Sequence, residues 1–280
     1  MYKERGWVAR RSALVHDGTL DEHKPAMAYV PELHESPAGS ATVRELLDMR
    51  ANFMFSDKPK VPGQVQMDYI TGLGFIPRTP DYVGARGVYE LLVDAKPMGA
   101  HGGMFRYDNG STDTLGWILR KATGQTLDAL IGELIWSRIG AERDASMTID
   151  TSGTEWAAGG MGAILRDFAR LGETLRCHGA FNGQQVLPEV VYRRIQQGGD
   201  RSIFGEGDDR PSGGSYRSQC WFFHDRHNSF GCRGQYGQRL WIAPKAELVF
   251  AQFGVDSQLL ALEPLRYRSF LAIADALAHG

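Results

Sequence analysis

The spacing of apolar residues changes along this chain, and that change limits the fold more than any other sequence feature. Between about residues 42 and 175, apolar residues recur at helical spacing. Strand-like runs rich in Trp, Phe, Val and Ile then follow at Ser218–Phe223, Arg239–Ile242 and Leu248–Phe253. A closing helix is expected at Tyr267–Leu277. This order predicts an α+β fold, in which an antiparallel β-sheet is flanked by helices and accompanied by a helical subdomain.

Local signals place several of the helices. Thr42 and Glu45 have the spacing of a capping box, which predicts a short helix at Thr42–Met49. Further amphipathic helices are predicted at Leu115–Ala122 (ending at Gly124), Leu127–Ile135 and Leu165–Leu175. The segment Lys58–Asp81 is rich in Pro and Gly, so we expect a long surface excursion there, with some apolar side chains packed inward.

Charge and cysteine content exclude several classes of protein. The 31 basic and 33 acidic side chains give a net charge of −2, which offers no broad surface for nucleic acid or anionic membrane. No apolar stretch approaches the roughly 18 residues of a membrane span. Three cysteines without a C-x-x-C favour a reducing compartment. We therefore expect a cytoplasmic protein. The alternative is a protein whose signal peptide is missing from this sequence.

Common catalytic and metal-binding motifs are missing from the sequence. There is no G-x-S-x-G, Walker A motif, H-E-x-x-H or Rossmann fingerprint. His224 and His227 stand at H-x-x-H spacing, but no third ligand has a convincing spacing, so we interpret them as polar loop residues. Neither a metal nor an organic cofactor is expected.

One segment does indicate a reaction. Pro97–Gly124 contains a glycine-rich loop, then F-x-Y-x-N, then a helix that we expect to open at Ser111 or Thr112. This order would hold Tyr107 and Asn109 near a helix start, where a phenol can reach a reacting centre. Two structural alternatives remain: Tyr107 as a packing residue, and Asn109 as a left-handed turn residue beside Gly110.

The Y-x-N segment resembles the second motif of the serine β-lactamase and penicillin-binding-protein superfamily, and most of all the aminohexanoate-dimer hydrolases and related esterases. Further segments resemble the same family in the same order. They are Ala13–Met49, Gly159–Gly172, Gln184–Pro188 and Arg233–Pro244. The resemblance therefore runs from about residue 13 to the C-terminus.

The resemblance implies acyl transfer through a serine ester, with an oxyanion held by two backbone N–H groups. It implies that Tyr107 carries a proton to the leaving group, that Asn109 helps to position Tyr107, and that the Gln235 N–H is one oxyanion donor. An ordinary turn residue is the alternative for Gln235. Substrate-binding positions are implied at Ala158, Gly159, Gly234, Tyr236 and Gly237.

Two departures from the family pattern bear on the chemistry. Ala158 stands where nylon-oligomer-type relatives often carry a substrate-binding Asn, so their substrate class does not transfer. Moreover, no serine in the sequence is followed by Lys three residues later. Counting back from Gly18 places the family's nucleophile and lysine at Met1 and Glu4, so we expect an N-terminally truncated domain.

These observations define the expected organisation and function. We expect a single β-lactamase-like domain over residues 1–280, incomplete at its N-terminus, with a mainly helical region at about 42–175 and the sheet and last helix at about 216–280. The expected function is that of a serine hydrolase of amides or esters, inactive as this chain. The alternatives are a non-catalytic binding or assembly module, or a decayed product. The expected partner is a small amide or ester, and homodimerisation stays open.

Overall fold

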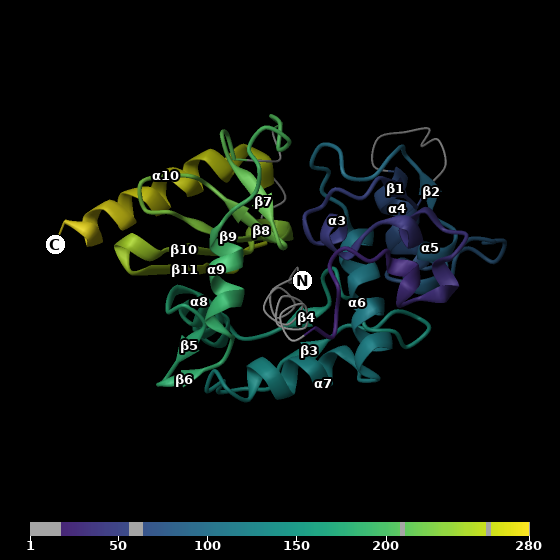
Figure 1. Cartoon of the computed structure of the whole chain (residues 1–280), viewed down its shortest axis with the longest axis horizontal. Helices are drawn as coiled ribbons and strands as arrows, with labels where there is room; N and C mark the ends of the chain where they lie inside the picture. The colour runs from purple at the N-terminus through teal and green to yellow at the C-terminus, as the bar shows by residue number, and fades with distance from the viewer. Residues whose placement is uncertain (1–17, 56–63, 208–210, 256–258, 280) are drawn as a thin grey trace.

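The computed structural model describes residues 18–55, 64–207, 211–255 and 259–279. Its elements form two regions, one built on an antiparallel sheet and one mainly helical (Figure 1). The helical region contains α2 to α7 and the sheet region contains β7 to β11, with α8 and α10 packed on the sheet. The predicted α+β architecture is therefore confirmed.

The main sheet has five strands in the order β11-β10-β9-β8-β7, and each strand is antiparallel to its neighbours. The strands are β7 (Ser215–Arg217), β8 (Cys220–Phe222), β9 (Phe230–Arg233), β10 (Arg239–Ala243) and β11 (Leu248–Gln252). The strand predicted at 218–223 instead begins at Cys220, because Ser218 and Gln219 form the tight turn after β7 with φ of 49° and 68°. Neither β7 nor β9 was predicted as a strand.

Helices cover both faces of this sheet. Helix α8 (Leu165–Arg176) packs on β10 and β11, and Gly172 permits this approach because a Cβ there would lie 2.6 Å from Val249. Helix α10 (Leu259–Ala278) covers the opposite face, where Phe270 and Ala274 are fully buried against Trp241. Helix α10 is longer than the predicted Tyr267–Leu277.

The helical region is organised around α6 (Asn109–Thr123), whose residues from Gly110 to Leu119 are all buried. Gly124 ends this helix in a left-handed conformation, as predicted. The other helical elements are η1 (Ala26–Ala28), η2 (Pro31–Leu33), α2 (Pro37–Ser40), α3 (Val43–Leu47), α4 (Gln64–Gly72), α5 (Val88–Val93), α7 (Leu127–Ile131) and the π-helical η3 (Gly132–Trp136). Elsewhere α9 (Glu189–Gln196) precedes the sheet, and η4 (Gln235–Gly237) and η5 (Pro244–Ala246) flank β10.

Four of the local predictions can be compared directly. The capping box of Thr42 and Glu45 is present at α3, and the helices predicted near 127–135 and 165–175 correspond to α7 with η3 and to α8. The expected excursion at 58–81 was wrong in part, because α4 is a helix that buries Tyr69. Three short pairs complete the fold: β1 (Phe53–Met54) with β2 (Lys96–Pro97), β3 (Ser146–Met147) with β4 (Met161–Gly162), and β5 (Ala180–Phe181) with β6 (Gln184–Gln185).

Candidate active site

The segment that carries Tyr107 is held in place by its backbone. The Phe105 N–H donates to the Ile203 carbonyl at 2.8 Å, and the Arg106 N–H donates to the Met49 carbonyl at 2.8 Å. The Arg106 guanidinium also donates to the Phe53 carbonyl. Two flanking segments therefore fix the two residues immediately before Tyr107, and its phenol starts from a rigid base.

Asp108 sets the start of α6. Its carboxylate accepts hydrogen bonds from the Ser111 N–H and hydroxyl, both at 2.8 Å, so Asp108 is the N-cap. The helix therefore opens at Asn109, and the expected start at Ser111 or Thr112 was wrong because the acidic cap lies further upstream. Asn109 is the first helical residue and not a left-handed turn residue. Desolvation raises the pKa of the Asp108 carboxyl above its ordinary value, against the opposing effect of Arg106.

Trp221 on β8 brings Tyr107 close to the end of β9. The ring centroids of Tyr107 and Trp221 are 5.5 Å apart, and the Arg233 guanidinium lies 5.0 Å from the Trp221 ring. Arg233 immediately precedes Gly234 and Gln235. One buried indole therefore contacts both the Y-x-N segment and the strand that leads to the predicted oxyanion donor, although about 125 residues separate the two in the sequence.

The turn after β9 is tight and well supported. The Gly234 N–H donates to the Gln238 carbonyl at 2.8 Å, and Tyr236 has a left-handed φ of 57°. The fully buried Arg239 donates to the carbonyls of Gly234 and Gln238 at 2.9 and 2.7 Å. Because an arginine holds both carbonyls, the Gly234–Gln235 backbone has a fixed orientation, as an oxyanion donor requires.

A buried polar network links α6 to the Ala158–Gly159 loop. The Asp113 carboxylate accepts hydrogen bonds from the Ala158 N–H at 2.9 Å and from the Tyr69 hydroxyl at 2.5 Å. The Trp156 indole donates in turn to the Tyr69 hydroxyl at 2.5 Å. Burial, and then the Asp113 charge, raise the pKa of Tyr69 well above its ordinary value, so this phenol stays protonated and donates to Asp113.

Sequence reasoning did not identify Asp113, which lies four residues after Asn109 and therefore one turn along the same side of α6. That spacing is the signal that could have found it. Thus α6 connects the Y-x-N segment to Ala158 and Gly159, while Trp221 connects Tyr107 to the end of β9. Tyr236 and Gly237 complete the η4 turn that begins at Gln235, and the Gln252 side chain donates to the Gly237 carbonyl at 3.1 Å.

Two Ser–His pairs occur among the described residues, and neither has the properties of an activated nucleophile. Ser215 lies 2.7 Å from His224 Nε2, but it is fully buried and accepts the Gly199 N–H at 3.0 Å. Ser40 lies 3.0 Å from His101 Nε2. Because His101 Nδ1 accepts the Asn52 N–H at 2.9 Å, Nε2 carries the ring proton and cannot take one from Ser40.

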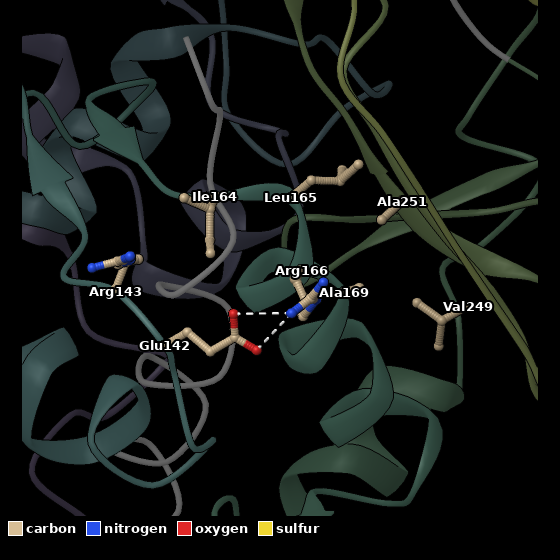
Figure 2. Close-up of a pocket in the computed structure, with 8 residues that line it drawn as sticks. All are labelled: Glu142, Arg143, Ile164, Leu165, Arg166, Ala169, Val249 and Ala251. Carbon is tan, nitrogen blue, oxygen red and sulfur yellow. Dashed lines mark hydrogen bonds and ion pairs between the residues drawn. The ribbon is translucent and has the colours of Figure 1, made fainter.

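A pocket of about 720 Å³ lies away from the predicted site, between β11, the start of α8 and the loop at 142–143 (Figure 2). Glu142 spans it toward Arg166 at 3.1 Å. None of the predicted site residues lines it. Among the residues that the structure describes, no group of three or more His, Cys, Asp or Glu side chains is arranged to hold a metal ion. Over the same ranges, no helix is both long and apolar enough to cross a bilayer.

Comparison with known proteins adds independent information. A solved structure from Bacillus anthracis, provisionally assigned as a 6-aminohexanoate-dimer hydrolase, superposes with a TM-score of 0.85 and 30% identity, covering 99% of this chain and 72% of that one. A penicillin-binding protein from Bacillus halodurans has a TM-score of 0.65 at 14% identity, covering 96% of this chain and 85% of its own, and shows the fold alone.

The curated 6-aminohexanoate-dimer hydrolase of Paenarthrobacter ureafaciens is 28% identical over 243 residues. That match covers 86% of this chain, and the chain spans 61% of the relative's length. The positions predicted for the family's nucleophile and lysine, Met1 and Glu4, lie outside the described residues. The profile of the beta-lactamase family matches residues 8–253. The chain belongs to the beta-lactamase family.

Proposed function

We propose that this chain provides the proton-transfer and oxyanion-binding half of an acyl-transfer site for amide or ester bonds. The observation that carries the proposal is the position of Trp221, whose ring packs against Tyr107 and also lies 5.0 Å from the guanidinium of Arg233, the residue before Gly234. An acyl-transfer site needs a proton shuttle and an oxyanion donor beside one carbonyl group. The curated relative is named for hydrolysing an amide, the 6-aminohexanoate dimer.

Each group would have a defined role in amide cleavage. A nucleophilic oxygen bonds to the carbonyl carbon, and the carbonyl oxygen gains negative charge that the Gln235 N–H stabilises. The carbon–nitrogen bond then breaks, and Tyr107 passes the proton that the nucleophilic hydroxyl released to the leaving nitrogen. Asn109, fixed at the first turn of α6, would orient Tyr107. Water finally hydrolyses the ester that remains on the nucleophile.

The proposal assigns no nucleophile within this sequence. The sequence contains no S-x-x-K. In the two described Ser–His pairs, Ser215 is buried and His101 has no ring nitrogen free to accept a proton from Ser40. We therefore expect that this 280-residue chain forms no acyl-enzyme. A fluorophosphonate probe, which labels activated serines, should leave it unlabelled, and it should hydrolyse nitrophenyl esters no faster than a heat-denatured control. Stoichiometric labelling of any serine would show that the nucleophile has been misassigned.

The substrate-binding side differs from that of nylon-oligomer-type relatives. Ala158 cannot offer the side-chain hydrogen bond of the Asn that those relatives often carry, and its own N–H is already bonded to Asp113. The proposed substrate class is therefore a small amide or ester, and the 6-aminohexanoate dimer is one test compound among several. Any form of this protein that turns over such a compound should lose about 10²–10⁴-fold in kcat on Tyr107→Phe, with Tyr82→Phe as a matched control.

A second candidate is a non-catalytic module that binds a small amide or ester at the predicted site without cleaving it. The absence of S-x-x-K from the sequence favours it. Calorimetric titration with the linear 6-aminohexanoate dimer, together with chromatography of the mixture, separates the two functions. Binding without release of 6-aminohexanoate supports the module. Release that Tyr107→Phe lowers by about 10²–10⁴-fold supports the enzyme, and it would overturn the expectation that this chain forms no acyl-enzyme. If the wild-type protein neither binds nor cleaves the amides and esters tested, both candidates fail.

A further inference from the structure

Cys220 and Cys232 face each other across two inner strands of the main sheet. Strands β8 and β9 pair antiparallel, with Trp221 opposite Gly231. The same register, extended by one residue, places Cys220 opposite Cys232, and each cysteine lies within its strand. Directly opposite residues of an antiparallel pair project from the same face of the sheet. The two thiols are therefore neighbours, although they are 12 positions apart in the sequence (232 − 220).

Packing shows that the two cysteines share a face. Both are buried in the large core cluster that also contains Phe222 and Phe230. These two rings, two residues further along the same strands, stack with their centroids 5.8 Å apart. Because side chains alternate along a strand, each phenylalanine points the same way as the cysteine of its own strand. Trp221 belongs to the cluster on the other face, where it packs against Tyr107. The cysteine pair therefore lies on the face opposite to the one that contacts Tyr107.

The cysteine pair occupies the type of cross-strand position where side chains come closest. The Phe223 N–H donates to the Ser229 carbonyl at 3.0 Å, so these two residues form a hydrogen-bonded pair. The two types of pair alternate along a ladder, which makes the pair at 220 and 232 non-hydrogen-bonded. Cα atoms in such a pair are about 4.5 Å apart, within the range of about 4.4–6.8 Å that disulfides span. A bond between the two sulfur atoms therefore needs little movement of the backbone.

The cysteine pair also lies at one end of the β8–β9 ladder. The residue before Cys220 is Gln219, whose N–H donates to the Leu47 carbonyl at 2.9 Å, outside the sheet, and whose φ of 68° is left-handed. Cys220 and Cys232 are 0% and 5% exposed, so an oxidant reaches them when this end of the ladder opens. Such local opening breaks few backbone hydrogen bonds and leaves the rest of the fold intact.

We propose that Cys220 and Cys232 are a reversible redox pair that closes into a cross-strand disulfide when the protein meets hydrogen peroxide. One thiolate attacks a peroxide oxygen and breaks the O–O bond, which gives a sulfenic acid and, after protonation of the departing hydroxide, one water. The second thiolate attacks the sulfenic sulfur, forms the S–S bond and displaces hydroxide, which becomes a second water. The two thiols lose two electrons and the peroxide gains them. A dithiol reductant reverses the reaction by thiol–disulfide exchange.

The closed form ties together the two strands that flank the support of Tyr107. The disulfide closes a ring of 13 residues (232 − 220 + 1), which contains the β8–β9 turn. Because the closed ring restricts the unfolded chain, closure should raise the melting temperature by about 5–10 °C. This effect is the same whether or not the candidate site cleaves amides or esters.

Oxidation of the native chain tests this proposal. A Cys177→Ser background removes the third cysteine of the sequence. Hydrogen peroxide should then convert most of the protein into a form that has lost two hydrogen atoms, and mass spectrometry of a digest should find the peptides of 220 and 232 joined. Dithiothreitol should restore both thiols and the original melting temperature. In the same background, Cys220→Ala and Cys232→Ala should show neither an intramolecular disulfide nor a rise in melting temperature. Circular dichroism spectra show whether each variant is folded.

Several results would overturn the proposal, and the wild-type pair alone is enough to obtain them. If both thiols survive peroxide treatment of the native protein and a disulfide forms only after unfolding in urea, the two cysteines are packing residues of the core. Oxidation of one sulfur to a sulfinic acid without an S–S bond, or a disulfide that joins two chains, would also contradict the pair. So would an intramolecular disulfide at 220 and 232 that leaves the melting temperature unchanged or lowers it.

Discussion

Replacement of Asp113 should show how strongly the buried network holds the candidate site. The Asp113 side chain is 2% exposed and accepts hydrogen bonds from the Ala158 N–H and the Tyr69 hydroxyl. In Asp113→Ala both donors stay buried without this acceptor, and each unsatisfied group costs about 1–3 kcal/mol. We therefore expect the free energy of unfolding to fall by about 3–5 kcal/mol.

Asp113→Asn provides the graded comparison. Its amide oxygen can still accept one of the two hydrogen bonds, but its NH₂ group faces the other donor, so the expected loss is about 1–3 kcal/mol. Tyr69→Phe removes the hydroxyl that donates to Asp113 and accepts from the Trp156 indole, and it should cost a similar amount. Urea denaturation followed by circular dichroism measures all three variants.

The control is Asp144→Asn, which changes an exposed carboxylate and should shift stability by less than about 0.5 kcal/mol. Because Asp113 and Tyr69 share one hydrogen bond, the double variant Asp113→Asn/Tyr69→Phe should cost less than the sum of the single variants. A loss below about 1 kcal/mol for Asp113→Ala, or full additivity in the double variant, would refute the reasoning.

Two further predictions concern the sheet and α10. Arg226, and then His227, hold the pKa of Asp275 at about 2, below its ordinary value. Ionised Asp275 therefore stabilises the fold above about pH 4, and this contribution is lost as pH falls toward 2. Melting temperatures of wild type and Asp275→Asn should thus differ at pH 6 and converge near pH 2; a constant difference would contradict this. Gly231→Val should cost more than about 3 kcal/mol, because a Cβ at Gly231 would lie 2.1 Å from the Leu240 carbonyl oxygen. Gly132→Ala, where a Cβ meets no atom within 4 Å, should be tolerated in the same urea titration.

Short-range signals in the sequence correctly predicted the helix ends that are fixed by contacts within one helical turn. The Thr42–Glu45 capping box and the left-handed Gly124 act within one helical turn, so short segments were enough to place α3 and the end of α6. Strand β9 escaped prediction because Gly231 interrupts the apolar pattern, although the close β10 backbone requires a glycine there. The need for that glycine arises from a neighbouring strand, which the sequence of β9 alone does not reveal.

The candidate site was predictable in part for a similar reason. Resemblance of the Y-x-N and R-G-Q-Y-G segments to family motifs identified Tyr107 and Gln235, and their catalytic roles remain predictions. Sequence reasoning did not find Asp113 and Trp221, which support the predicted site residues, because each contacts a residue that is distant in the sequence. Asp113 contacts Ala158, 45 residues away, and Trp221 contacts Tyr107 across 114 residues (221 − 107). No periodicity or spacing rule connects residues at such separations.

The two predicted parts of the site are coupled through α6. Tyr107 precedes Asp108, the N-cap of this helix, and packs against the aromatic rings of Trp221 and Tyr216. Ala158 donates a directional hydrogen bond to Asp113, which lies on the same helix. A displacement of α6 would therefore move the Ala158–Gly159 loop together with the segment that carries Tyr107, so a substitution that shifts α6 should change both parts of the candidate site.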